Sequence, residues 1–199
     1  MQKLLGNLKR GLLFVLSAPA GSGKTTLTEM LVKEFPCVVE SISFTTRQPR
    51  GKEVDGKHYF FISREEFQRK IIEGEFLEYA EIYGDYYGTS WKWVEEQRNQ
   101  GKHVVPVIDT QGAAQVREKC LATFVFILPP SLEALRERLT KRKTESPEEI
   151  GKRLNWAKKE IEESKKYDYA IVNHDLETSY QVLKSIFIAE EHRRVKQEY

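Results

Sequence analysis

The chain has 199 residues, of which 40% are hydrophobic and 31% charged, a size and composition typical of one compact domain. Its 32 Lys and Arg residues nearly balance its 30 Asp and Glu residues, so the formal net charge is only +2. This balance argues against a protein that mainly coats nucleic acid, and the hydrophobic content excludes intrinsic disorder.

The cysteines and the apolar runs indicate a reducing environment away from membranes. Cys37 and Cys120 lie far apart with no C-x-x-C motif, which favours buried free thiols over a disulfide or a zinc site. The longest apolar runs, Leu12–Leu16 and Phe124–Leu128, are too short to cross a bilayer. The first run is also too short for a secretory signal, so we expect a cytoplasmic protein without membrane or nucleic-acid partners.

Strand and helix patterns alternate at the start of the chain. Leu12–Ser17 is apolar on both faces and predicts a buried parallel strand. A glycine-rich turn follows, and residues 24–34 predict a helix that Pro36 terminates. Val38–Ile42 predicts a second strand.

The pattern changes between Phe44 and Tyr87, where Arg, Gly and Tyr are frequent and short alternating runs occupy 58–62 and 76–82. A helix is expected to begin at Ser63, which forms an S-x-x-E capping box with Glu66. This section predicts an inserted subdomain.

The second half of the chain returns to strands that alternate with helices. Strands are predicted at 104–108, 124–128 and 169–172. Ser131 and Ser146 each favour a helix start, the second reinforced by Pro147 and Glu149, and 178–189 predicts a final amphipathic helix. This order predicts right-handed βαβ crossovers and a three-layer α/β fold with a parallel core sheet.

A phosphate-binding motif joins the first predicted strand to the first predicted helix. It matches G-x-x-x-x-G-K-[ST] except that Ala18 replaces the first glycine. Small residues let several backbone N–H groups converge on one phosphate at a helix N-terminus. Lys24 is then expected at the β- and γ-phosphates and the Thr25 hydroxyl at Mg²⁺, whereas the alternative is a simple connecting turn. The nucleotide-binding segment comprises Ala18, Pro19, Ala20, Gly21, Ser22, Gly23, Lys24, Thr25 and Thr26.

The stretches SFTTRQPR at 43–50 and EVDGKHYFF at 53–61, together with this motif, resemble the guanylate kinase family. Its members transfer phosphate from ATP to GMP. The resemblance covers 11–190 and implies a P-loop nucleoside monophosphate kinase fold. It implies a core at 11–42, 91–135 and 165–190, a GMP-binding subdomain at 43–90, a helical lid at about 136–164 and a C-terminal tail at 191–199.

The resemblance also implies a binding site for the phosphate of GMP. Its residues are Ser43, Arg47, Arg50, Tyr59 and Tyr87. Independently of the family, arginine can form bidentate bonds to phosphate oxygens, and the hydroxyl groups add further bonds. The alternative is that these are solvated surface groups in a polar loop.

Base recognition is expected from Glu78, because one carboxylate can accept both the N1–H and N2–H of guanine, and adenine offers no such pair. Thr89 matches a family position that donates to guanine O6, and Asp109, in D-x-Q-G, matches one near the guanine amine. The alternative for Glu78 is a solvent-facing strand residue.

On the ATP side, Arg142 and Arg153 match lid arginines that reach the ATP phosphates, and Asn173 resembles the family's adenine-contacting Asn. The expected catalytic residues are Lys24, Arg47, Arg142 and Arg153. The chain departs from the family pattern at Phe44, where a polar residue is usual, and at Val107 and His174, where Asp is usual.

The resemblance implies an ATP:GMP phosphotransferase that also accepts dGMP, uses ATP and Mg²⁺, and is a monomer or homodimer. Two other functions remain open from the residues. One is a binding module that shares the fold without the chemistry. The other is a GTPase switch, since 109–112 also fits D-x-x-G, although no N-K-x-D motif occurs.

Overall fold

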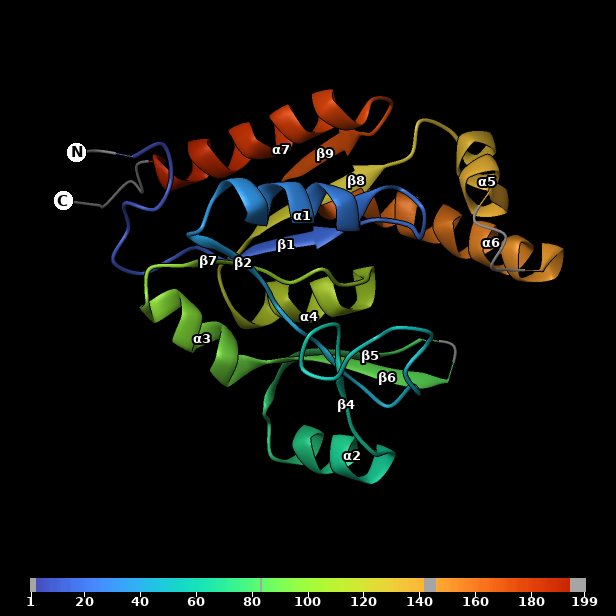
Figure 1. Ribbon diagram of the computed structural model, residues 1–199, viewed down its shortest axis with the longest axis horizontal. Coiled ribbons are helices and arrows are strands. Elements are labelled where there is room, and N and C mark those ends of the chain that lie inside the picture. The colour runs from blue at the N-terminus through green and yellow to red at the C-terminus, as the bar shows by residue number, and fades with distance from the viewer. Residues whose placement is uncertain (1–2, 83, 142–145, 194–199) are drawn as a thin grey trace.

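The computed structural model describes residues 3–82, 84–141 and 146–193 (Figure 1). Its centre is a parallel sheet with the strand order β2–β7–β1–β8–β9. A bridge from Leu13 to Val104 joins the β2–β7 pair to β1. The strands are β1 (Phe14–Ser17), β2 (Val38–Glu40), β7 (His103–Val105), β8 (Thr123–Leu128) and β9 (Tyr169–Val172).

Helices cover both faces of this sheet, which confirms the predicted three-layer α/β fold (Figure 1). On one face, α1 (Lys24–Glu34) and α7 (Leu176–Glu191) bury a cluster that includes Leu27, Phe14 and Phe187. On the other face, α3 (Trp91–Asn99) and α4 (Thr110–Lys119) bury a second cluster. Because both faces are covered, all four residues of β1 are buried.

A second sheet forms the body of the inserted segment, with the order β4–β3–β6–β5. The α2 helix packs on it through Phe67, whose ring stacks at 4.5 Å on Phe76 and at 5.2 Å on Tyr86. The elements are β3 (Phe44–Thr45), β4 (Phe60–Phe61), α2 (Arg64–Ile72), β5 (Phe76–Ile82) and β6 (Asp85–Ser90).

Two helices, α5 (Leu132–Lys141) and α6 (Pro147–Glu163), project from the core beside the carboxyl end of β1 (Figure 1). They pack on each other through a small apolar cluster of their own, Leu135, Leu139, Ile150, Leu154 and Ala157. Ser146 and Glu149 form the full capping box expected at the start of α6. A 3₁₀ turn, η1 (Ser164–Lys166), leads from α6 to β9.

Several element boundaries differ from those predicted. β7 ends at Val105 because Pro106 has no N–H to donate, and the predicted strand at 104–108 continues beyond it only as a bridge from Val107 to Leu16. α7 begins at Leu176 because the Asp175 side chain accepts from Thr178 N at 2.8 Å. The helix α3 is not among the predicted elements, although Ser90 caps it by accepting from Trp93 N.

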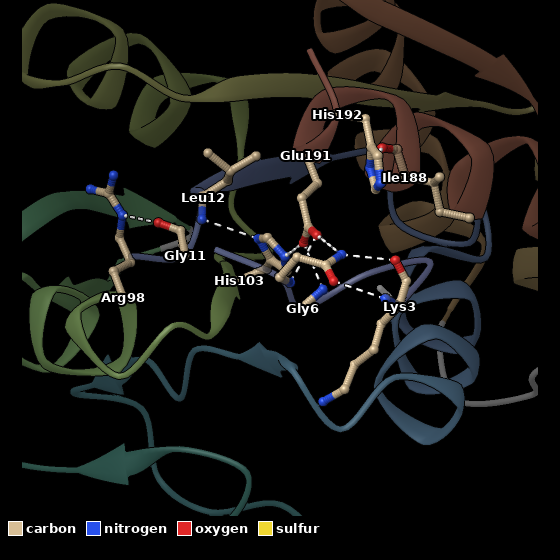
Figure 2. A network of polar contacts seen from close by, with 10 residues as sticks. Lys3, Gly6, Gly11, Leu12, Arg98, His103, Ile188, Glu191 and His192 are labelled. Atoms are coloured by element: carbon tan, nitrogen blue, oxygen red, sulfur yellow. Dashed lines mark hydrogen bonds and ion pairs between the residues drawn. The ribbon is translucent and has the colours of Figure 1, made fainter. Parts of the chain in front are cut away.

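A buried polar cluster ties the N-terminal segment to the end of α7 (Figure 2). Glu191 accepts bonds from Gly6 N at 2.6 Å and from Asn7 N at 2.9 Å, and it lies 2.6 Å from His103 Nε2. His103 Nδ1 accepts from Leu12 N at 3.1 Å, so Nε2 carries the proton and donates to Glu191. Glu191, the first residue of the expected tail, is thus a buried residue of α7.

No helix in the described part of the chain has the length and apolarity needed to cross a bilayer.

Candidate active site

The predicted phosphate loop connects β1 to α1 at the carboxyl edge of the core sheet. Gly21 and Gly23 adopt φ of 94° and 92°, a left-handed conformation that side-chain-bearing residues rarely adopt. The N-cap of α1 is Gly23, with no side-chain hydrogen bond and no acidic residue in the first turn. The start of α1 therefore has neither a side-chain cap nor a first-turn acid to compete with an anion for its N–H groups.

The other residues of the loop are placed as the motif requires. Lys24 Nζ lies at the backbone of the phosphate loop (the phosphate cradle, residues 18–26) and donates to the Ala18 carbonyl at 3.2 Å. The Ala18 side chain is buried in the core cluster beneath β1, while Thr25 and Thr26 are exposed on the first turn of α1. Ser22 N donates to the Pro19 carbonyl at 3.1 Å, which closes the turn.

The loop touches two neighbouring elements. A Cβ atom on Gly21 would lie 3.2 Å from Leu135 and 3.3 Å from Leu139 on α5. On the other side, Asn173 Nδ2 donates to the Ser22 carbonyl at 2.8 Å. A cavity of about 440 Å³ opens between these contacts and is lined by Gly21, Gly23, Arg138, Lys141, Asn173, His174, Asp175 and Leu176.

Asn173, expected at adenine, has its side chain 4% exposed and engaged within the protein. Its Oδ1 accepts from Ser179 Oγ at 3.0 Å, and its Nδ2 is bonded to the loop. Arg153 lies half-buried on α6. Arg142 lies outside the described residues.

Glu78 lies in the inserted subdomain, on β5, opposite Thr89 on β6. Its side chain is 3% exposed, which rules out the alternative of a solvent-facing strand residue. Thr89 Oγ1 donates to Glu78 Oε1 at 2.6 Å, so here the hydroxyl proton expected at guanine O6 is held by Glu78. Burial raises the pKa of Glu78 to about 7, and the nearby Asp109 charge adds to the rise.

Asp109 reaches the same place from the core, because it caps the N-terminus of α4. Its Oδ1 accepts from Gly112 N at 2.9 Å. A Cβ atom on Gly112 would overlap Glu78 Oε2, so the Glu78 carboxylate can occupy this position only with glycine there. The structure therefore brings Glu78, Thr89 and Asp109 together, as expected.

Arg47, the central residue of the expected phosphate site, is 8% exposed, which rules out a solvated surface group. It donates to both carboxylate oxygens of Glu53 at 2.9 Å, and through Nε to Tyr87 OH at 3.2 Å. Its guanidinium also lies 5.3 Å from the centre of the Tyr59 ring. The cluster thus unites three expected residues with Glu53, which was not predicted.

Glu53 also organises the loop that carries Arg50, since its Oε2 accepts from Arg50 N at 2.7 Å. The hydrogen bonds from Arg47 hold the pKa of Glu53 below its ordinary value. Ser43 lies beside this cluster, where its carbonyl accepts from Phe60 N at 2.9 Å. The only sequence signal for the pair is the spacing of six residues from Arg47 to Glu53 in a short loop.

Two further carboxylates, one half-buried and one buried, interact electrostatically with Lys24 and were not predicted. Glu40, at the end of β2, and Glu160, on α6, both have a pKa raised to about 7 by burial, with Lys24 opposing the rise. Acidic groups from the core sheet and from α6 therefore act on Lys24.

Val107, where the family usually has Asp, packs against the core cluster beneath β1.

Across residues 3–82, 84–141 and 146–193, no group of three or more His, Cys, Asp or Glu side chains is arranged to hold a metal ion. Any Mg²⁺ would rely on the phosphates that accompany it and on the Thr25 hydroxyl, the kind of oxygen donor it prefers.

Comparisons with known proteins point to one family. The family model described as "Guanylate kinase" matches residues 10–190. The curated guanylate kinase of Protochlamydia amoebophila is 58% identical over 94% of this chain and 95% of that protein. That of Geobacter sulfurreducens is 47% identical, over 94% and 93%. The crystal structure of guanylate kinase from Anaplasma phagocytophilum matches with a TM-score of 0.76 at 35% identity, covering 96% of this chain and 90% of that one.

Proposed function

The chain belongs to the guanylate kinase family and is an ATP:GMP phosphotransferase, and we propose the residues through which it binds and joins its two substrates. Its architecture is that of a P-loop nucleoside monophosphate kinase. The observation that carries the proposal is the buried Glu78 carboxylate, held by Thr89 and placed beside Asp109.

In this proposal, Glu78 accepts the N1–H and N2–H of guanine, with Thr89 and Asp109 at the base edge. AMP presents an acceptor at N1 and would leave the buried carboxylate unpaired, which is costly in a site excluded from water. Arg47, Arg50, Ser43, Tyr59 and Tyr87 bind the phosphate of GMP.

The loop from Ala18 to Thr26 holds the ATP phosphates at the N-terminus of α1, and Lys24 contacts the transferred group. Mg²⁺, when bound to ATP, neutralises charge on the β- and γ-phosphates, with the Thr25 hydroxyl as the ligand from the protein. Arg153, and Arg142 beyond the described residues, complete the charge neutralisation from the lid. The protein's part in catalysis is positioning and exclusion of water, since phosphoryl transfer needs little covalent chemistry from it.

The remaining parts of the proposal concern organisation. Residues 43–90 form the GMP-binding subdomain and about 136–164 the lid. We also propose that the enzyme accepts dGMP as well as GMP, and that it acts in the cytoplasm as a monomer or homodimer.

A coupled assay of ADP release tests the function. The protein is supplied with Mg²⁺ and ATP and with GMP, dGMP, AMP, CMP or UMP in turn. We expect ADP release that depends on GMP or dGMP and is at least ~10⁴-fold slower with AMP. Equal rates with AMP would remove Glu78 from base selection. Binding of both nucleotides without turnover would indicate a binding module, and slow GTP hydrolysis without GMP would indicate a GTPase.

A further inference from the structure

Asn173, the residue that follows β9, bonds the phosphate loop although it is distant from it in sequence. Its Nδ2 donates to the Ser22 carbonyl at 2.8 Å, and its Oδ1 accepts from Ser179 Oγ at 3.0 Å. All three residues are buried, so these bonds are shielded from water.

The backbone of Asn173 is fixed as well. Its N–H donates to the Leu128 carbonyl at 2.8 Å, and its carbonyl accepts from Arg138 Nη2 on α5 at 3.0 Å. With both main-chain groups and both side-chain heteroatoms engaged, the amide is a rigid support rather than a mobile group.

The bond to Ser22 fixes a peptide plane of the cradle. The described chain has no cis peptide bonds, so the Ser22 carbonyl and the Gly23 N–H point in opposite directions. Holding the carbonyl therefore sets the direction of the Gly23 N–H at the start of α1, where the loop presents its donors to an anion.

Two features of this arrangement require glycine at position 23. Its φ of 92° suits glycine, and a Cβ atom there would lie 2.5 Å from Asn173 Nδ2. The close approach of the amide to the loop is therefore part of the loop's conformation, not an incidental contact.

We propose that Asn173 is a positioning residue of the phosphate cradle: its amide holds the Ser22–Gly23 peptide in the phosphate-binding orientation, and Ser179 holds the amide. This inference rests on the proposed function, because it takes the loop as the site of the ATP phosphates. It assigns Asn173 to the phosphates rather than to the adenine expected from the family resemblance.

Tripolyphosphate separates these two roles, because it carries the phosphates of ATP without adenine. Calorimetry measures binding of Mg·ATP, Mg·tripolyphosphate and GMP to the full chain. Asn173→Ala should weaken ATP and tripolyphosphate by the same factor, about tenfold, because it leaves the Ser22 carbonyl unpaired. GMP affinity should remain unchanged and report that the protein is folded.

Ser179→Ala tests the same support with a smaller perturbation, and is decisive if Asn173→Ala does not fold. It should weaken tripolyphosphate by a smaller factor, and the double variant should bind no worse than Asn173→Ala alone. Gln181→Ala, an exposed change on the same helix, is the matched control and should alter none of the three affinities.

Loss of ATP affinity with full retention of tripolyphosphate affinity would overturn the proposal in favour of an adenine contact. Unchanged binding of both ligands would also overturn it, as would an equal loss of GMP, which would indicate a general structural role. These outcomes differ from failure of the proposed function, in which the unmodified protein itself shows no GMP-dependent release of ADP.

Discussion

The carboxylate of Glu78 lies directly against the backbone of Gly112, one turn into α4. A Cβ atom on Gly112 would overlap Glu78 Oε2 and would lie 3.0 Å from Cδ. The present position of the Glu78 carboxylate therefore depends on the absence of a side chain at Gly112.

Gly112→Ala is therefore expected to displace Glu78 and lower kcat/KM for GMP by about tenfold or more, because a displaced buried acid no longer pairs with guanine. The affinity for ATP should not change. Steady-state kinetics with each substrate varied in turn measures both effects.

Gly151→Ala is the matched control, since Gly151 is also a helical glycine but has nothing within 4 Å of its added Cβ. Alanine there should leave GMP kinetics unaltered and raise helix stability by up to about 1 kcal/mol. If both variants behaved alike toward GMP, the Gly112 contact would have no role in recognition.

Guanine binding should depend on pH through Glu78. With a pKa of about 7 in the free protein, Glu78 loses its charge as the pH falls through neutrality, and the protonated acid accepts the guanine donors poorly. Guanosine, which has no titrating phosphate, should inhibit more weakly at pH 6 than at pH 8. Inhibition that is independent of pH would contradict this role, and Glu78→Gln should abolish the dependence.

The raised pKa of Glu78 also makes the stability of the fold depend on pH. Lower pH weakens guanine binding but favours the folded state. The folded pKa of Glu78 is raised from 4.5, so its contribution to stability is present below about pH 4.5 and is lost as the pH rises through about 7. Chemical denaturation of Glu78→Gln should accordingly show a higher free energy of unfolding than the parent at pH 8, by on the order of 3 kcal/mol at most. A variant less stable than the parent at pH 8 would refute this.

Arg47→Lys should impair GMP binding selectively, because lysine cannot reproduce the fork that spans Glu53 and Tyr87. We expect the KM for GMP to rise about tenfold or more, with inhibition by guanosine unchanged. Arg64→Lys, an exposed pair with Glu81 in the same subdomain, should leave both values as they are. Equal losses of GMP and guanosine would instead mean that Arg47 supports the whole subdomain.

Glu191→Ala should destabilise the fold without altering catalysis, since the change leaves Gly6 N–H, Asn7 N–H and His103 Nε2–H without their acceptor (Figure 2). Removing one member of such a buried cluster costs roughly 3–5 kcal/mol. Denaturant titration measures the loss, and Glu177→Ala, exposed on the same helix, should cost at most about 1 kcal/mol. A loss no larger than that of the control would refute the assignment.

Local sequence signals predicted most of the core. The limits of α1 and β9 follow directly from the motif, Pro36 and the apolar pattern. The helix α3 escaped prediction because its two tryptophans resemble isolated packing residues and its start depends on the Ser90 cap. Of the capping box expected at α2, the structure shows the bond from Glu66 N to Ser63.

The candidate site residues were predicted from motif chemistry and from the family resemblance, but their partners were not. The sequence around Glu53, Gly112 or Ser179 does not indicate which residue each will contact, because these contacts form only through tertiary packing. A sequence pattern identifies a residue that can bind a phosphate or a base. The residue that orients this side chain can be identified only from the three-dimensional structure.

Gly21 is the point at which the phosphate loop contacts α5. Because Leu135 and Leu139 of α5 lie against this glycine, a shift of the loop backbone would displace the helix directly. The helices α5 and α6 share one apolar cluster, so α6, which carries Arg153 and Glu160, would follow a displacement of α5. We therefore expect any movement of the loop at Gly21 to be coupled to movement of the α5–α6 pair.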